Sequence, residues 1–239
     1  MAHFEIDGGN ALFYLHTAPA RAGAPTFVFV NALTGSTGHW EAAVAPALRA
    51  PGFGTLSYDF RGQAESRFAP GTALTPALIV ADLQRLLAGL APRRPVLAGL
   101  SIGGLFAAQA ILAGAAASGL VLLNTLREIG PRVAWVNDAL PALAAHGGVE
   151  LFLDALFPLI VNQEFAAEAR PNFLKGGYRP MDPDHPHLDL MRHAVEADWA
   201  IDSHRPRACR PGSARASRLA PGPARRNWAA GGRPRISGR

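Results

Sequence analysis

The amino-acid sequence predicts an α/β fold built on a mostly parallel sheet. Strand-like and helix-like segments alternate from residue 26 to residue 124, and this alternation is typical of βαβ units. Several of the strand-like segments are short, continuous apolar runs, as expected of strands that are covered on both faces. Residues 127–199 read as helices only, and residues 203–239 show no hydrophobic periodicity.

Each element follows from its local pattern. Residues 2–7 and 11–17 alternate in polarity on either side of Gly8-Gly9-Asn10, which predicts a β-hairpin. The segment 74–90 is the clearest helix, because its leucines and alanines recur at helical spacing and form one apolar face. The remaining strands are expected at 26–31, 55–60, 95–100 and 119–124, and the remaining core helices at 39–50 and 103–113.

Three regions are expected along the chain: an α/β core (residues 1–126), an inserted helical lid (127–199) and a basic low-complexity tail (200–239). Residues 1–202 hold 13 basic and 18 acidic residues, whereas residues 203–239 hold ten arginines and no acid. In that last segment 27 of 37 residues are Ala, Gly, Pro or Arg. Such a composition cannot bury enough surface to offset the entropy lost on ordering.

Two explanations of the tail are open. The codons of Ala, Gly, Pro and Arg begin with two G or C bases, so a GC-rich gene read out of frame from about residues 199–204 would give this mixture. The alternative is a genuine basic arm whose arginines contact nucleic-acid phosphates. The tail contains no known nucleic-acid-binding module, so the first explanation is favoured and a nucleic-acid partner is not expected.

Composition also bears on compartment and cofactors. No apolar run reaches the roughly 20 residues that a membrane span needs, and the first residues are polar, so neither a membrane partner nor a secretory signal is expected. Cys209 is the only cysteine, which fits a cytoplasmic protein. Asp189 and His193 share a helical face, but the spacing matches no strong metal template, and neither a metal nor another cofactor is expected.

The segment from Gly99 to Gly103 carries the strongest chemical signal. Its sequence, Gly-Leu-Ser-Ile-Gly, matches the pattern G-x-S-x-G between a strand and a helix, which is the setting of a serine nucleophile. Side chains at the two glycines would collide with the neighbouring strand and helix. The turn is expected to hold the Ser101 hydroxyl at the carboxyl end of the strand, near the positive end of the following helix.

Together with three further motifs, this segment resembles the α/β-hydrolase fold family, nearest to lid-bearing serine esterases and lactonases of the 3-oxoadipate enol-lactonase type. Residues 31–36 stand where the family has H-G-x-G-G-S, and residues 58–66 resemble its D-x-R-G-x-G-x-S turn. Asp82-Leu83 fits the helix before the nucleophile. The resemblance covers roughly residues 3–200 and implies a hydrolase sheet with a helical lid, from which the C-terminal strand–helix units are missing.

The resemblance implies acyl transfer. Ser101 would attack the carbonyl carbon of a small-molecule ester or lactone, and the backbone N–H groups of Leu33 and Ile102 would bind the oxyanion. Asp59 and Arg61 flank a turn, and a buried pair there would fix the loop. Trp40 is expected to pack beneath the oxyanion loop.

The sequence does not locate the catalytic acid and histidine. The family places both after the lid, where this chain has no strand-like segment, and Glu128 and His204 are only weak candidates. Three hypotheses therefore stand: a serine esterase or lactonase, a catalytically inactive remnant of such a hydrolase, and a basic-tailed nucleic-acid-binding protein on a hydrolase scaffold. The sequence does not indicate an oligomeric state.

Overall fold

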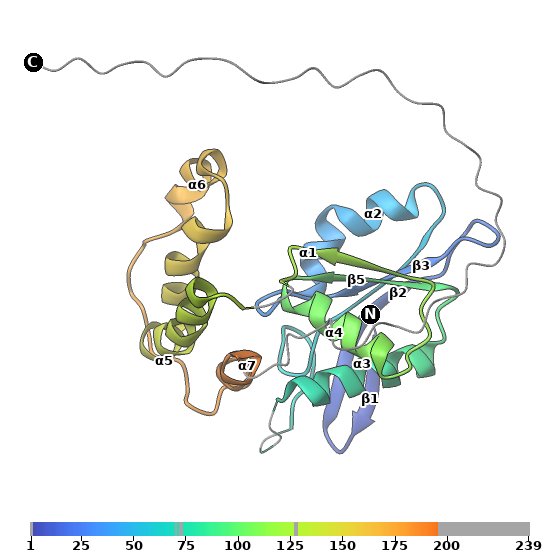
Figure 1. The fold of residues 1–239 in the computed structure, drawn as a ribbon, viewed down its shortest axis with the longest axis horizontal. Coiled ribbons are helices and arrows are strands. Elements are labelled where there is room, and N and C mark those ends of the chain that lie inside the picture. The colour runs from blue at the N-terminus through green and yellow to red at the C-terminus, as the bar shows by residue number, and fades with distance from the viewer. Residues whose placement is uncertain (1, 70, 72–73, 127–128, 196–239) are drawn as a thin grey trace, which may run out of the picture. The chain divides into compact units, whose positions relative to one another are not determined.

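A six-stranded sheet organises the computed structural model, which describes residues 2–69, 71, 74–126 and 129–195 (Figure 1). The strands are β1 (Ala2–Asp7), β2 (Asn10–Thr17), β3 (Thr26–Val30), β4 (Gly54–Tyr58), β5 (Pro95–Leu100) and β6 (Gly119–Leu123). They lie in the order β1-β2-β4-β3-β5-β6. β2 pairs antiparallel with β1 and with β4, while β4, β3, β5 and β6 pair in parallel. The prediction of a mostly parallel α/β sheet is confirmed.

Helices cover both faces of the parallel strands. The core helices are α1 (Thr37–Ala42), α2 (Val44–Arg49), α3 (Pro76–Leu90) and α4 (Ile102–Leu112). Leu86 of α3 and Phe106 of α4 are buried in one cluster with Val28 of β3. The next residue of β3, Phe29, is buried in a separate cluster with Trp40 of α1. Because successive side chains of a strand point to opposite faces, α3 and α4 cover one face and α1 covers the other.

One helix differs from its prediction. Residues 39–50 were expected to form a single helix, but α1 and α2 are separated at Ala43, whose φ of −147° is not helical. Pro46 gives the physical reason. In a continuous helix its ring would clash with the carbonyl group of Ala42, whereas proline is tolerated in the first turn of a new helix such as α2.

The segment predicted as a lid contains helices and no named strand within the described residues. It comprises α5 (Pro131–Ile160), α6 (Gln163–Ala169), the short 3-10 helix η1 (Arg170–Asn172) and α7 (Pro186–Val195). α5 is kinked at Gly148, which has a φ of 74°, where the sequence predicted a break. By length and composition alone α5 is apolar enough to span a membrane, although the run is broken by this kink.

α7 packs both against α5 and against the core of the sheet. Leu188 and Met191 lie in a small core with Leu140, Ala144 and Phe152 of α5. Between them, Leu190 is buried in the main core of the sheet, and the Asp189 carboxylate accepts a hydrogen bond from the Leu74 backbone N–H at 2.7 Å. The domain boundaries at 126 and 199 stay predictions, and the predicted tail, residues 200–239, lies outside the described residues.

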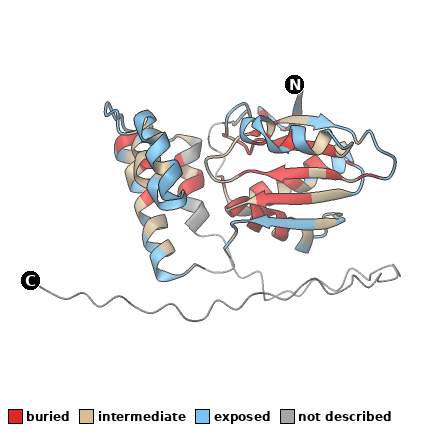
Figure 2. Ribbon diagram, turned by 90° about the horizontal axis from the view of Figure 1, so that it is seen from above, coloured by how far each residue is buried: buried red, intermediate tan, exposed pale blue. Residues whose placement is uncertain are grey.

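The two edges of the sheet differ in exposure (Figure 2). β4 is buried along its whole length, and β3 nearly so. β1 alternates between half-buried and exposed residues, as expected of a strand with one solvated face. β6 is exposed at four successive apolar residues. Within the described residues, β6 is thus the more exposed of the two edge strands.

Candidate active site

Ser101 occupies the sharp turn between β5 and α4. Its backbone has φ 54° and ψ −125°, a conformation that a residue with a Cβ rarely adopts. Its N–H donates a hydrogen bond to the Leu123 carbonyl at 2.8 Å, and its carbonyl oxygen accepts one from the Thr125 hydroxyl at 2.9 Å. The end of β6 thus holds the strained turn in place, and the half-buried serine stands at the carboxyl end of β5, as predicted.

The flanking glycines are required because the backbone passes close by. A Cβ on Gly99 would collide with the backbone of Gly104, and a Cβ on Gly103 would collide with the carbonyl oxygens of Val30 and Asn31. The glycines of G-x-S-x-G therefore allow β5, α4 and the end of β3 to meet around Ser101. This explains why the spacing of the motif is fixed.

The loop after β3 is tied down by the side chain of Asn31. This amide is fully buried, and its Nδ2 lies 3.0 Å from the Tyr58 carbonyl oxygen and 3.2 Å from Oδ1 of Asp59. Its Oδ1 accepts a hydrogen bond from Nε1 of Trp40 at 2.7 Å. The Trp40 ring stacks on Phe29 with 4.6 Å between the ring centroids. Trp40 thus supports this loop from the core.

Gln63 is a further residue that the sequence reading missed. Its Nε2 donates hydrogen bonds to the carbonyl oxygens of Leu33 at 2.7 Å and Ala32 at 3.1 Å, and its Oε1 accepts one from the Phe60 N–H at 3.1 Å. The side chain is completely buried. Gln63 therefore fixes the backbone of Leu33, the residue predicted to donate to the oxyanion. The only indication in the sequence is that Gln63 lies within the 58–66 turn motif, at a position where the motif specifies no residue type.

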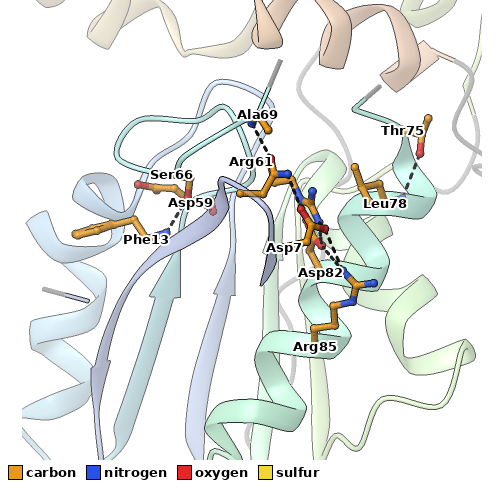
Figure 3. A network of polar contacts seen from close by, with 11 residues as sticks. Asp7, Phe13, Asp59, Arg61, Ser66, Ala69, Thr75, Leu78, Asp82 and Arg85 are labelled. Atoms are coloured by element: carbon orange, nitrogen blue, oxygen red, sulfur yellow. Dashed lines mark hydrogen bonds and ion pairs between the residues drawn. The ribbon is translucent and has the colours of Figure 1, made fainter. Parts of the chain in front are cut away.

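Arg61 does not pair with Asp59, contrary to the expectation for this turn. Its Nε and Nη2 donate to the two carboxylate oxygens of Asp82 at 2.5 and 2.7 Å (Figure 3). Both side chains are about 2 % exposed. A second, longer contact joins Nη2 of Arg61 to the half-exposed Asp7 at 3.4 Å. The guanidinium group reaches helix α3, so the pair ties this turn to α3.

Asp59 instead accepts hydrogen bonds from the loops around the site. Its carboxylate accepts from the Thr37 N–H at 2.6 Å, as well as from the Asn31 side chain and the Glu65 N–H. Burial raises the pKa of Asp59 above its usual value, and these hydrogen bonds offset part of the effect. Asp59 and Arg61 are both buried and structural, as expected, but through different partners.

The two predicted oxyanion donors come from the residue after Ser101 and from the loop after β3. Ile102 is buried and is the first residue of α4. Its N–H therefore belongs to the first turn of that helix, where backbone N–H groups have no partner within the helix. Leu33 is half-buried and contacts both the main core and the helical cluster of α5 and α7. Their role in binding an oxyanion stays a prediction.

Among the described residues, the Ser101 hydroxyl forms no hydrogen bond with a histidine or a carboxylate. Nδ1 of His146 lies 2.7 Å from the Ala142 carbonyl oxygen of its own helix. Glu128 and His204, the two weak candidates, lie outside the described residues. Within the described residues, no group of three His, Cys, Asp or Glu could hold a metal ion.

A separate cavity of about 230 Å³ lies between α5, α6 and η1. Its wall is mostly apolar, and the ring of Phe157 stacks on that of Phe173 with 4.3 Å between the centroids. Asp154 and Arg170 contribute the charged side chains of the wall. Ser101 does not line this cavity.

Comparison with known proteins agrees with the geometry. Residues 27–236 match the model of the alpha/beta hydrolase family, a range that includes most of the arginine-rich segment. An enol-lactonase from Burkholderia xenovorans LB400 is 25% identical, with a TM-score of 0.60, covering 84% of this chain and 74% of its own. No curated protein gave a significant match.

Two other solved structures share the fold at lower identity. An α/β hydrolase from a Medee basin deep-sea metagenome library has a TM-score of 0.63 at 20% identity, covering 82% of this chain and 70% of its own. A thermophilic esterase from Thermogutta terrifontis has a TM-score of 0.58 at 21% identity, covering 80% of this chain and 67% of its own.

The sheet, the serine turn and the family match together define an α/β-hydrolase fold. The chain belongs to the alpha/beta hydrolase family. The resemblance that the four motifs indicated is thereby confirmed.

Proposed function

We propose that this hydrolase cleaves a carboxylic ester or lactone by acyl transfer through Ser101. The observation that carries the proposal is the backbone of Ser101, held at φ 54° between β5 and α4. Strained conformations of this kind are kept where the surrounding structure enforces them, and they gather at active sites. A serine on such a strand-to-helix turn is the nucleophile elbow of α/β hydrolases.

The enol-lactonase and the esterase among the similar structures support this substrate class. In the proposed reaction the Ser101 Oγ forms a bond to the substrate carbonyl carbon and the C–O bond of the ester or lactone breaks. The leaving alkoxide oxygen takes up the proton that the serine hydroxyl loses, and in a lactone it stays attached to the acyl group. The N–H groups of Leu33 and Ile102 stabilise the negative charge on the carbonyl oxygen. Water then hydrolyses the acyl-serine and releases the acid.

A second candidate is a catalytically inactive hydrolase. It is favoured by the absence of a histidine hydrogen-bonded to Ser101 among the described residues. A serine hydroxyl without a general base is a weak nucleophile near neutral pH. Loss of triad members lowers the turnover number by about 10⁴- to 10⁶-fold, and the remaining rate comes from the oxyanion hole and binding.

The experiment is hydrolysis of a nitrophenyl ester and of a small lactone by purified, folded protein. Ser101→Ala should remove all hydrolysis above the buffer rate, whereas Ser118→Ala, which changes an exposed serine before β6, should leave it unchanged. Hydrolysis that survives Ser101→Ala would contradict the proposal. Protein that is folded but gives only the buffer rate would favour the inactive candidate.

A further inference from the structure

Leu33 lies in the turn after β3, and its half-buried side chain packs against two separate hydrophobic cores. One is the main core of the sheet. The other, which we call the helical cluster, comprises Leu140, Ala144 and Phe152 of α5 with Leu188 and Met191 of α7. Among the partly buried side chains that pack on the helical cluster in the described chain, only Leu33 precedes α5. The cluster therefore meets the sheet at the residue whose N–H is a predicted oxyanion donor.

The backbone of this turn is held by hydrogen bonds from the core. The Gly35 N–H donates to the Ala32 carbonyl at 3.0 Å and closes the turn around Leu33. The Leu33 carbonyl oxygen accepts a hydrogen bond from Nε2 of the buried Gln63 at 2.7 Å. The core thus restrains the carbonyl side of Leu33, whereas the helical cluster restrains its side chain.

α7 anchors the helical cluster to the sheet. Leu190 is buried in the main core, while Leu188 and Met191 of the same helix belong to the helical cluster. Between them, the Asp189 carboxylate accepts a hydrogen bond from the Leu74 N–H at 2.7 Å. Because protein cores are close-packed, a shift of α7 would move the surface against which Leu33 packs.

We propose that the helical cluster positions the backbone N–H of Leu33 for oxyanion binding by packing on the Leu33 side chain. With the carbonyl group held by Gln63 and the Cα–Cβ bond directed by the cluster, rotation about the N–Cα bond of Leu33 is restricted, so the direction of the N–H is fixed. A donor that is fixed in advance stabilises an oxyanion without reorganisation. Met191 is then a positioning residue that acts through Leu33. The inference rests on the proposed function for the role of this N–H, whereas the packing contact does not.

Amide hydrogen exchange of the full chain tests the contact without any need for activity. Met191→Ala should speed exchange of the Gly35 amide by about tenfold, because a buried side chain of the cluster is lost and the turn around Leu33 loosens. Met191→Leu keeps the apolar volume and should restore the natural rate. The matched control is Phe173→Ala, which removes a half-buried ring outside the helical cluster and should leave Gly35 unchanged. In each variant the amides of β3 serve as the reference for a general loss of stability.

Leu33→Ala shows whether the effect passes through the Leu33 side chain. In that background Met191→Ala should cause no further change in exchange at Gly35, because the contact that couples the two sites is already missing. Additive effects of the two substitutions would overturn the proposal. So would an equal response of Gly35 to Met191→Ala and to Phe173→Ala, since a general loosening of the helices would then explain both.

The rate at which a fluorophosphonate probe labels Ser101 extends the test to the active site. Met191→Ala should lower this rate by about tenfold and Met191→Leu should restore it, because the phosphonyl oxygen requires the oxyanion donors in the transition state. Faster exchange at Gly35 with an unchanged labelling rate would overturn the positioning role. If the natural chain were not labelled at all, the proposed function would fail. Faster exchange at Gly35 in Met191→Ala would then still support the packing contact, and unchanged exchange would overturn it.

Discussion

The Thr125 hydroxyl donates a hydrogen bond to the carbonyl oxygen of Ser101 at 2.9 Å, and so joins the end of β6 to the strained turn after β5. A Cβ on Gly104 would collide with this threonine, which shows how closely the two segments pack. The support of Ser101 thus depends on a residue 24 positions further along the chain.

Replacing this threonine should weaken the turn. Thr125→Val keeps the shape of the side chain but removes the donor, and we expect the free energy of unfolding to fall by about 1 kcal/mol. Thr17→Val is the control, because Thr17 is an exposed residue of β2. Urea denaturation of both variants gives the comparison. An equal effect of the two substitutions would show that the Thr125 hydrogen bond does not stabilise the fold.

Replacing one member of the buried Arg61–Asp82 pair should lower the free energy of unfolding strongly. Asp82→Asn leaves the buried guanidinium group with only its longer contact to the half-exposed Asp7, and we expect a loss of about 3–5 kcal/mol in unfolding free energy. Asp7→Asn weakens the half-exposed contacts of Asp7 with Arg61 and Arg85 and should cost much less.

A double variant distinguishes the net contribution of the ion pair from the cost of leaving one buried charge unpaired. Arg61→Met with Asp82→Leu removes both charges and should recover most of the stability lost in Asp82→Asn. Denaturant unfolding of all three variants measures the difference. If Asp82→Asn were as stable as Asp7→Asn, the ion pair would not fix the turn to α3.

The stability of the fold should depend on pH through Asp59. Burial raises the pKa of its carboxyl group in the folded chain above the ordinary value of 3.8. The folded state therefore holds this proton more tightly than the unfolded state does. The contribution to stability is fully present below pH 3.8 and is lost as pH rises through the raised pKa.

Asp59→Asn isolates this contribution, because the asparagine does not titrate. The free energy of unfolding of the natural chain minus that of the variant should decrease as pH rises through this window. Asp7 should behave in the opposite sense, since its hydrogen bond with Asn10 lowers its pKa. Stability linked to Asp7 is present above pH 3.8 and is lost as pH falls. A difference between natural chain and Asp59→Asn that rises with pH would contradict the assignment.

Local patterns were enough to predict most of the fold. The strand at 95–100 has the predicted bounds, because a buried apolar run between a turn and a glycine motif has few alternatives. The turn at Ser101 was likewise predictable, since its glycines are required by packing within a few residues. The prediction of one continuous helix at 39–50 was wrong, because the ring of Pro46 would clash with the carbonyl group of Ala42 in such a helix.

Partners across the chain could not be read from the sequence. Arg61 lies two residues from Asp59 but pairs with Asp82 of α3, which lies 21 residues further along the chain. Gln63 gave no signal of its own, since a glutamine in a turn is usually solvated. Its role follows only from the approach of the loop after β3, 30 residues earlier.

The most direct test of the account is covalent labelling with a fluorophosphonate probe, followed by mass spectrometry of the modified peptide. Folded protein should be phosphonylated at Ser101 alone and more slowly than a hydrolase with a complete triad, because no described histidine is hydrogen-bonded to the serine hydroxyl. Ser101→Ala should abolish the labelling. Modification of a different residue with Ser101 left intact would contradict Ser101 as the nucleophile. Rapid labelling of Ser101 would contradict the prediction of slow labelling and would show that a base in the folded protein activates the serine.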